Sequence, residues 1–148
     1  RGAEVVATTG AAKRAAVQRL GADRVLDREA DLPDVLGESS IDVVIDNVGG
    51  PGFAAMPKLL RRGGRLATSG AIAGPMVGLD LRDLYLKDIT LIGCTAWDEP
   101  VFPNLIGYIE RDAVRPVVAA TYPLARIADA QRDFLAKRHT GKLVLLPP

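Results

Sequence analysis

Hydroxyl-bearing and basic residues follow the first apolar stretch of the chain. Thr8-Thr9-Gly10 comes directly after Glu4-Val5-Val6-Ala7, and Lys13 and Arg14 stand a few residues later. In dinucleotide-binding folds an acidic residue near this strand end binds the adenosine ribose hydroxyls. Two hydroxyls and two cations occur here instead, and that combination suits a ribose 2′-phosphate. A solvated helix face with a threonine cap is the alternative, and the residues alone leave both open.

Small residues follow three further apolar stretches. Asp46-Asn47-Val48-Gly49-Gly50 comes after the first of them, Ser69-Gly70-Ala71 after the second, and Gly93-Cys94-Thr95-Ala96 after the third. Glycine lets a ligand approach the backbone closely, although an ordinary chain turn also uses glycine. Small side chains would leave room for a flat ring and expose backbone donors and acceptors. For Asp46, a turn acceptor is a more common role than a general base.

The remaining candidates are single residues near the end of the chain or isolated in it. Cys94 has no neighbouring histidine or evident cation, so we do not assign it as a nucleophile. His139 fits a solvated surface position, and Lys142 could reach a pyrophosphate or simply face solvent. One cysteine and one histidine fall short of the ligands that a zinc site needs, so we predict no metal ligands. We also assign no catalytic acid or base.

Alternating apolar and amphipathic segments predict an α/β fold with a parallel sheet and helices on both faces. Ligands of such sheets bind at the carboxyl ends of the strands, so the residues that directly follow the strands are the candidates for a site. Strands are predicted at 4–8, 24–27, 41–46, 65–69, 89–93, 117–122 and 143–146. Helical segments are predicted at 10–20, 31–36, 53–62, 81–86, 101–111 and 124–137.

Composition narrows the class of protein. The 148 residues are 48% hydrophobic and 25% charged, which is typical of a soluble globular protein. The net charge of +1 with scattered basic residues gives no case for nucleic-acid binding. No apolar run approaches the roughly 20 residues that a membrane span needs. We therefore expect a cytoplasmic protein that uses neither a membrane nor nucleic acid.

Several familiar motifs do not occur in the sequence. No G-x-G-x-x-G follows a predicted strand, and there is no Walker loop and no nucleophile elbow. The sequence also lacks a Tyr-x-x-x-Lys pair, which argues against the short-chain dehydrogenases. The chain starts without methionine and runs almost at once into a strand, so we expect residues upstream of Arg1.

Segments along nearly the whole chain resemble the medium-chain dehydrogenase/reductase superfamily (zinc-type alcohol dehydrogenase-like). Within it they are most similar to the C-terminal portion of the zinc-independent quinone oxidoreductase branch. The segments are Ala22-Asp23 after VQRLG, DVVIDNVGG, LLRRGGRLATSG, DLYLKDITLIGCT and YPLARIADAQRDFLAKRHTGKLVLLPP. Their order and spacing carry the resemblance, because each one alone is weak.

The resemblance implies a parent with a GroES-like domain and a Rossmann domain. Residues 1–113 would form part of the Rossmann domain, and residues 114–148 would return to the GroES-like catalytic domain. The first Rossmann strand and its glycine-rich loop would be absent from this chain. Because that strand lies in the middle of the family's sheet, the sheet would be incomplete and leave unpaired backbone groups. An isolated copy would then need the missing piece or another chain for stability.

The resemblance also assigns cofactor contacts to residues of this chain. Thr9 and Lys13 match positions near the adenosine ribose phosphate, and Thr8 stands beside them. Lys142 matches, less closely, a basic position near the pyrophosphate. The other matching positions are Val48 and Gly49 beside the adenosine ribose, Ser69, Gly70 and Ala71 beside the nicotinamide, and Cys94, Thr95 and Ala96 at its carboxamide.

The activity implied is that of an NADP-dependent reductase that passes hydride to a quinone, enone or similar small molecule. We expect this fragment to be inactive alone. The alternatives among enzymes are a zinc-dependent alcohol dehydrogenase and an enoyl reductase module. An alternative of another class is a non-catalytic remnant or dimerisation module. Family members dimerise through a sheet edge, which here would be Ile89 to Gly93 and would give a homodimer.

Overall fold

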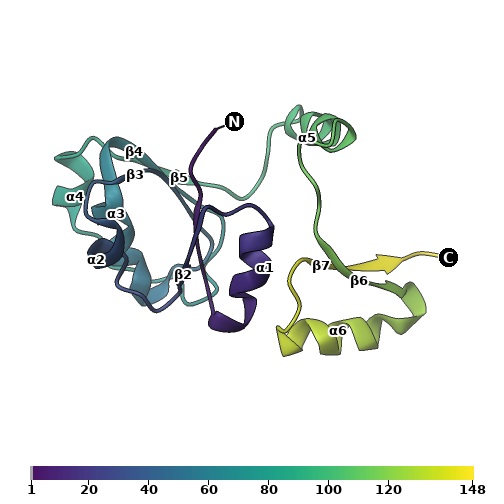
Figure 1. Cartoon of the computed structure of the whole chain (residues 1–148). Helices are drawn as coiled ribbons and strands as arrows, with labels where there is room; N and C mark the ends of the chain where they lie inside the picture. Colours follow the sequence, from purple (N-terminus) through teal and green to yellow (C-terminus); the bar gives the residue numbers. More distant parts are fainter. Residues whose placement is uncertain (1) are drawn as a thin grey trace. The chain divides into compact units, whose positions relative to one another are not determined.

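The computed structural model describes residues 2–148, so Arg1, where the predicted Rossmann segment begins, lies outside the described part. The chain folds into two compact units. One unit is formed by the residues up to Arg28 together with Glu99–Pro148, and the other by Glu29–Asp98. Figure 1 labels the helices and strands along the chain. The predicted division near residue 113 into parts of two domains stays a prediction.

The first unit contains two separate two-stranded sheets, and both are parallel. Its elements before Arg28 are β1 (Val6–Thr9), a 3₁₀ turn (Ala11–Lys13), α1 (Arg14–Arg19) and β2 (Arg24–Asp27). Its later elements are α5 (Val101–Glu110), β6 (Val118–Pro123), a 3₁₀ turn (Leu124–Arg126), α6 (Ile127–Ala136) and β7 (Lys142–Leu146).

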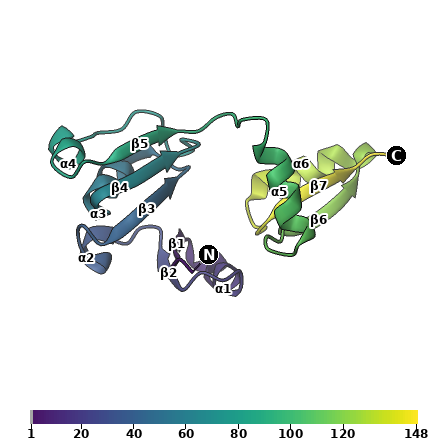
Figure 2. The same cartoon turned by 90° about the horizontal axis from the view of Figure 1, so that it is seen from above.

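The second unit contains one parallel sheet of three strands in the order β3-β4-β5 (Figure 2). Its elements are α2 (Leu32–Leu36), β3 (Ile41–Asp46), a 3₁₀ turn (Gly50–Ala55), α3 (Met56–Leu59), β4 (Leu60–Thr68), α4 (Leu81–Tyr85) and β5 (Thr90–Gly93).

One face of the three-stranded sheet forms the core of the second unit. Leu60 and Leu66 of β4 are almost fully buried and pack with Phe53 and Ile89. The partly buried side chains packed against this cluster are Ile41, Val44, Met56 and Leu84. On the opposite face, Ile45 is 73% exposed and Ile92 is 41% exposed. Burial of one face is enough to fix which side of each strand points inward.

The segment around Leu60 differs from the prediction. The sequence predicts a helix over 53–62, but α3 ends at Leu59 and Leu60 adopts an extended backbone (ψ 132°). β4 begins there and pairs with Ile41, and its register then jumps so that Val43 pairs with Arg65. The residues between Leu60 and Arg65 form a bulge, in which Gly63 has a φ of +74°. Burial of Leu60 against the core overrides the local helical pattern.

The α/β fold class with parallel strands is confirmed, and so is the expectation of an incomplete sheet. Within residues 2–148, β1 pairs only with β2 and β3 pairs only with β4, so the Rossmann-type strands form two sheets. Every predicted strand is present with bounds shifted by a few residues at most, apart from the early start of β4. None of the helices described is long and apolar enough to cross a bilayer.

We expect substitution of Leu66 to destabilise the second unit strongly. Leu66→Ala would leave a cavity beneath Leu60 and Ile89, at a loss of about 2–5 kcal/mol in the free energy of unfolding. Urea denaturation followed by circular dichroism measures this. Leu135→Ala on the exposed side of α6 is the control and should change the stability by less than about 0.5 kcal/mol. Equal effects of the two substitutions would contradict the assigned core.

Candidate functional site

The carboxyl ends of β3, β4 and β5 are aligned. Asp46 is paired in register with Thr68, and Thr68 with Gly93. The alignment continues past the strands, because the Ser69 amide donates to the Asp46 carbonyl (3.0 Å) and the Cys94 amide to the Thr68 carbonyl (2.8 Å). The predicted residues of the second unit therefore leave the sheet at one edge.

The turn after β3 is organised by the side chain of Asp46. This carboxylate is 7% exposed and accepts hydrogen bonds from the amides of Val48 (3.0 Å) and Gly49 (3.1 Å). A carboxylate that accepts backbone amides in this way makes a charge-assisted turn. Its role as a turn acceptor, which the sequence favoured over that of a base, agrees with this geometry.

The loop after β4 packs directly on that turn. The Ala73 amide donates to the Val48 carbonyl (2.8 Å), and the Gly50 amide donates to the Gly74 carbonyl (3.0 Å). Gly49 and Gly50 both have positive φ values, +61° and +65°. A Cβ atom on Gly49 would lie 2.7 Å from the Gly74 carbonyl oxygen. Much of the space next to Gly49, where the sequence suggested the approach of a ligand, is thus taken by the chain's own loop.

Most predicted residues at this edge are accessible to a ligand. Gly49 is buried, whereas Val48 is exposed. The other exposed members are Ser69, Gly70, Ala71, Cys94, Thr95 and Ala96. A Cβ atom at Gly93 would meet nothing within 4 Å, so the end of β5 offers open space. The carboxyl ends of these strands therefore combine small side chains with open space, which a flat ring would require for binding.

The predicted phosphate-binding residues lie in the first unit, at the end of β1. Thr8 is exposed, Thr9 is half-buried, and Lys13 ends the 3₁₀ turn that follows. The sequence did not single out Arg28, which follows β2. Its guanidinium occupies the space that a Cβ atom on Gly10 would need, and its amide donates to the Thr9 carbonyl (3.1 Å). Because β1 and β2 are in parallel register, Arg28 adds a cation beside Thr9.

Lys142 is the first residue of β7, and its side chain is exposed. Its amide donates to the Val117 carbonyl (2.8 Å), which fixes the start of the strand. The adjacent Gly141 has a φ of +105°, and a Cβ atom there would lie 2.5 Å from the same carbonyl oxygen. The role of Lys142 near a pyrophosphate stays a prediction.

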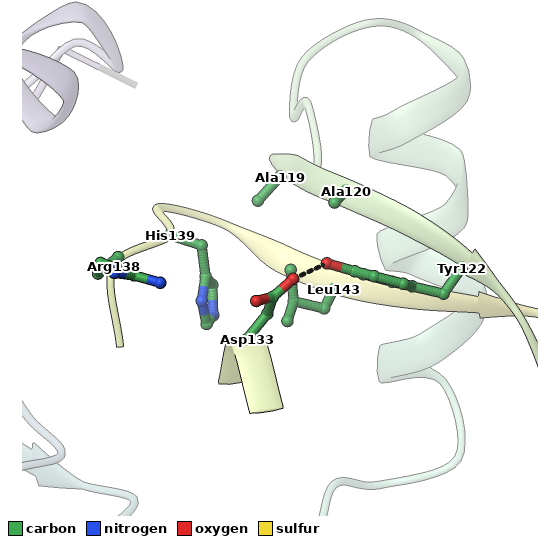
Figure 3. A pocket seen from close by; sticks show the side chains of 7 residues that line it. All are labelled: Ala119, Ala120, Tyr122, Asp133, Arg138, His139 and Leu143. Atoms are coloured by element: carbon green, nitrogen blue, oxygen red, sulfur yellow. Dashed lines mark hydrogen bonds between the residues drawn. The ribbon is translucent and has the colours of Figure 1, made fainter. Parts of the chain in front are cut away.

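A hollow of about 230 Å³ lies between β6, β7 and α6 (Figure 3). The Tyr122 hydroxyl donates to the Asp133 carboxylate across it, and this hydrogen bond raises the pKa of Tyr122 above its ordinary value. His139 also lines the hollow, and its buried Nδ1 has no hydrogen-bond partner in the described part of the chain. The pair Tyr122 and Asp133 joins a strand to a helix, which is a structural role.

Comparison with known proteins gives the family. The profile of the family described as "Zinc-binding dehydrogenase" matches residues 20–145. This chain belongs to that family, within the medium-chain dehydrogenase/reductase superfamily. The family description implies zinc, but among residues 2–148 no group of three or more His, Cys, Asp or Glu is placed to hold a metal ion. The described residues therefore do not fit a zinc site.

The chain is similar to parts of longer curated proteins. It is 32% identical to acryloyl-coenzyme A reductase of Metallosphaera sedula over 146 residues, which cover 97% of the chain and 43% of that protein. It is 30% identical to quinone oxidoreductase of Mus musculus over 116 residues, which cover 74% of the chain and 34% of that protein. The chain thus spans less than half of the length of these relatives.

Solved structures show the same fold. A Sinorhizobium meliloti 1021 protein assigned as an alcohol dehydrogenase is 46% identical, with a TM-score of 0.89 over 100% of this chain and 42% of its own. The 2-octenoyl-CoA carboxylase reductase CinF, in complex with NADP and 2-octenoyl-CoA, is 27% identical, with a TM-score of 0.84 over 97% of this chain and 37% of its own. Both the curated relatives and the solved structures include oxidoreductases, which supports an oxidoreductase as the protein to which this chain belongs.

The bond between Tyr122 and Asp133 predicts a pH-dependent contribution to stability. Only the neutral hydroxyl donates, so the folded-state pKa lies above the unfolded one. The stabilisation is complete below the unfolded pKa of about 10 and is lost as the pH rises through the folded pKa. Tyr122→Phe should lower the thermal midpoint at pH 7, and this difference should disappear as the pH rises through the folded-state pKa. A difference that grew with pH would contradict this assignment.

Proposed function

We propose that this dehydrogenase-family chain provides an NADPH-binding surface of a reductase that passes hydride to a quinone, an enone or a similar unsaturated carbonyl compound. The observation that carries the proposal is the aligned edge of β3, β4 and β5, where Ser69–Ala71 and Cys94–Ala96 expose small residues. The names of two relatives, acryloyl-coenzyme A reductase and quinone oxidoreductase, support this substrate class, because an acryloyl group is an unsaturated carbonyl.

The residues at the end of β1 favour NADPH over NADH. The strand ends in Thr8 and Thr9 without a carboxylate, and Lys13 and Arg28 add positive charge beside them. A ribose 2′-phosphate is a dianionic acceptor that guanidinium and hydroxyl groups bind well, whereas a bare ribose would leave these cations unpaired. NADP in the CinF structure supports the same choice.

The chain's own residues would bind and orient the cofactor, while the bound nicotinamide would supply the hydride. Val48 and Gly49 are proposed to contact the adenosine ribose and Lys142 the pyrophosphate. Ser69, Gly70 and Ala71 are proposed to lie along the nicotinamide ring, with Cys94, Thr95 and Ala96 at its carboxamide. No side chain of this chain is assigned as a proton donor, so that group would belong to another part of the protein.

Self-association and location extend the proposal. β5 is paired on one side only among the described residues, and its four residues are all exposed. An open apolar edge of this kind favours pairing with a second copy, so we propose a homodimer through Ile89 to Gly93. A cytoplasmic location is proposed for the same protein, in line with a small-molecule substrate.

Cofactor choice gives the most direct test of the proposal. Arg28→Gln removes one cation beside Thr9, and we expect the Kd for NADPH to rise at least tenfold while that for NADH changes less than twofold, since only NADPH carries the 2′-phosphate. Titration followed by nicotinamide fluorescence measures both constants. Arg24→Gln, at the other end of β2, is the matched control and should bind NADPH like the parent.

Two results would count against the proposal. Absence of any binding at millimolar NADPH would favour the non-catalytic remnant over the reductase. Equal losses for NADPH and NADH in Arg28→Gln would show that Arg28 acts on the fold and not on the phosphate.

The proposed dimer is tested at β5. Ile92→Lys places a charge on this exposed edge strand, and we expect it to lower the dimer fraction several-fold because of charge repulsion between copies. Analytical ultracentrifugation over a concentration series measures the fraction. Ile45→Lys on β3 is the control and should leave the dimer intact. A parent protein that stays monomeric at high concentration would refute the dimer.

A further inference from the structure

We infer that Asp46 is a positioning residue whose buried carboxylate holds the turn 47–50 and the loop 69–74 together as one unit. We call this unit the Asp46 clasp. The inference rests on the proposed function of this edge. Its consequence is that the predicted ribose contacts at Val48 and Gly49 and the predicted nicotinamide contacts at Ser69 to Ala71 cannot move independently.

The carboxylate of Asp46 is satisfied by backbone amides. It is 7% exposed, and its oxygens accept from the amides of Val48 and Gly49. A buried charge is costly unless hydrogen bonds compensate it, and the carboxylate of Asp46 receives that compensation from these amides. The amides of the turn compensate the buried charge of Asp46, and the carboxylate in return holds these amides in the turn conformation.

The same residue also contacts the second half of the clasp. Its carbonyl accepts from the Ser69 amide (3.0 Å), where the loop after β4 begins. The side chain of Asp46 thus binds the turn 47–50, and its main chain binds the start of the loop 69–74. These segments are separate in the sequence but adjacent at the carboxyl ends of the strands. A shift of Asp46 would disturb both segments together.

Further contacts lock the turn onto the loop. Val48 accepts from Ala73 (2.8 Å), and Gly50 donates to Gly74 (3.0 Å). A Cβ atom at Gly50 would lie 2.8 Å from the Ala73 carbonyl oxygen, so the two backbones are in close contact. Relaxation of the turn would break both hydrogen bonds, because one partner of each bond lies in the turn. The loop after β4 would then lose its anchor at positions that follow Ser69 to Ala71.

The test uses Asp46→Asn, which keeps the shape but replaces one acceptor oxygen with an NH₂ group. Hydrogen exchange without cofactor should accelerate at least tenfold for Val48 and Gly49 and also for Gly50 and Ala73, while the amides of β4 change little. The Kd for NADPH should rise at least tenfold. The Kd for 2′,5′-ADP should rise clearly less than that for NADPH, because this ligand keeps the adenosine ribose at Val48 and Gly49 but lacks the nicotinamide half at Ser69 to Ala71.

Two further variants keep the test decisive. Asp42→Asn, on the same strand, alters an exposed carboxylate paired with Arg61 and should match the parent in both exchange and affinity. Ala73→Pro removes the amide that donates to Val48 without touching Asp46. If Asp46→Asn does not fold, Ala73→Pro should show the same accelerated exchange in the turn and the same selective loss of NADPH affinity.

Each other outcome overturns the inference in a distinct way. Acceleration confined to Val48 and Gly49 would show that the two segments are not coupled. Coupled acceleration with unchanged NADPH affinity would reduce Asp46 to a structural role. A parent protein that binds neither NADPH nor 2′,5′-ADP would refute the proposed function, and the positioning role with it, whatever the exchange data show.

Discussion

The parallel register of β3, β4 and β5 is the constraint on which the candidate site depends. Pairing of Asp46 with Thr68 and of Thr68 with Gly93 makes all three strands end at one level. Since side chains alternate along a strand, a slip by one residue would exchange the buried and exposed faces. Burial of Leu66 on one face therefore fixes the strand register, and the register fixes where the loops leave the sheet.

Much of the fold was accessible from the sequence. The β-branched run Val43 to Ile45 predicted a strand, and the alternation of strands with helices predicted parallel pairing. The local pattern failed at Leu60, because a leucine-rich segment fits a helix as well as a buried strand start. Only its packing against Phe53 and Ile89 decides between them, and such packing joins segments that are distant in sequence.

The site was less accessible than the fold. Small residues after the strands predict a site at the carboxyl ends of the sheet, since parallel strands end together. Arg28 was not found, because its place beside Gly10 depends on the pairing of β1 with β2. The sequence predicts that another group lies close to the backbone of the glycines after Asp46. It does not reveal that this group is the loop after β4 of the same chain. The cofactor contacts remain predictions at all these positions.

The bulge between Leu60 and Arg65 has a consequence for the evolution of chain length. It sets Arg61 to Gly64 opposite a single residue of β3, and the ladder resumes unchanged beyond it. An insertion or deletion here changes the length of the bulge but leaves the pairing of Arg65 to Thr68, and therefore the end of β4, in place. The same change between Arg65 and Thr68 would turn over each following side chain, so indels among natural variants should gather upstream of Arg65.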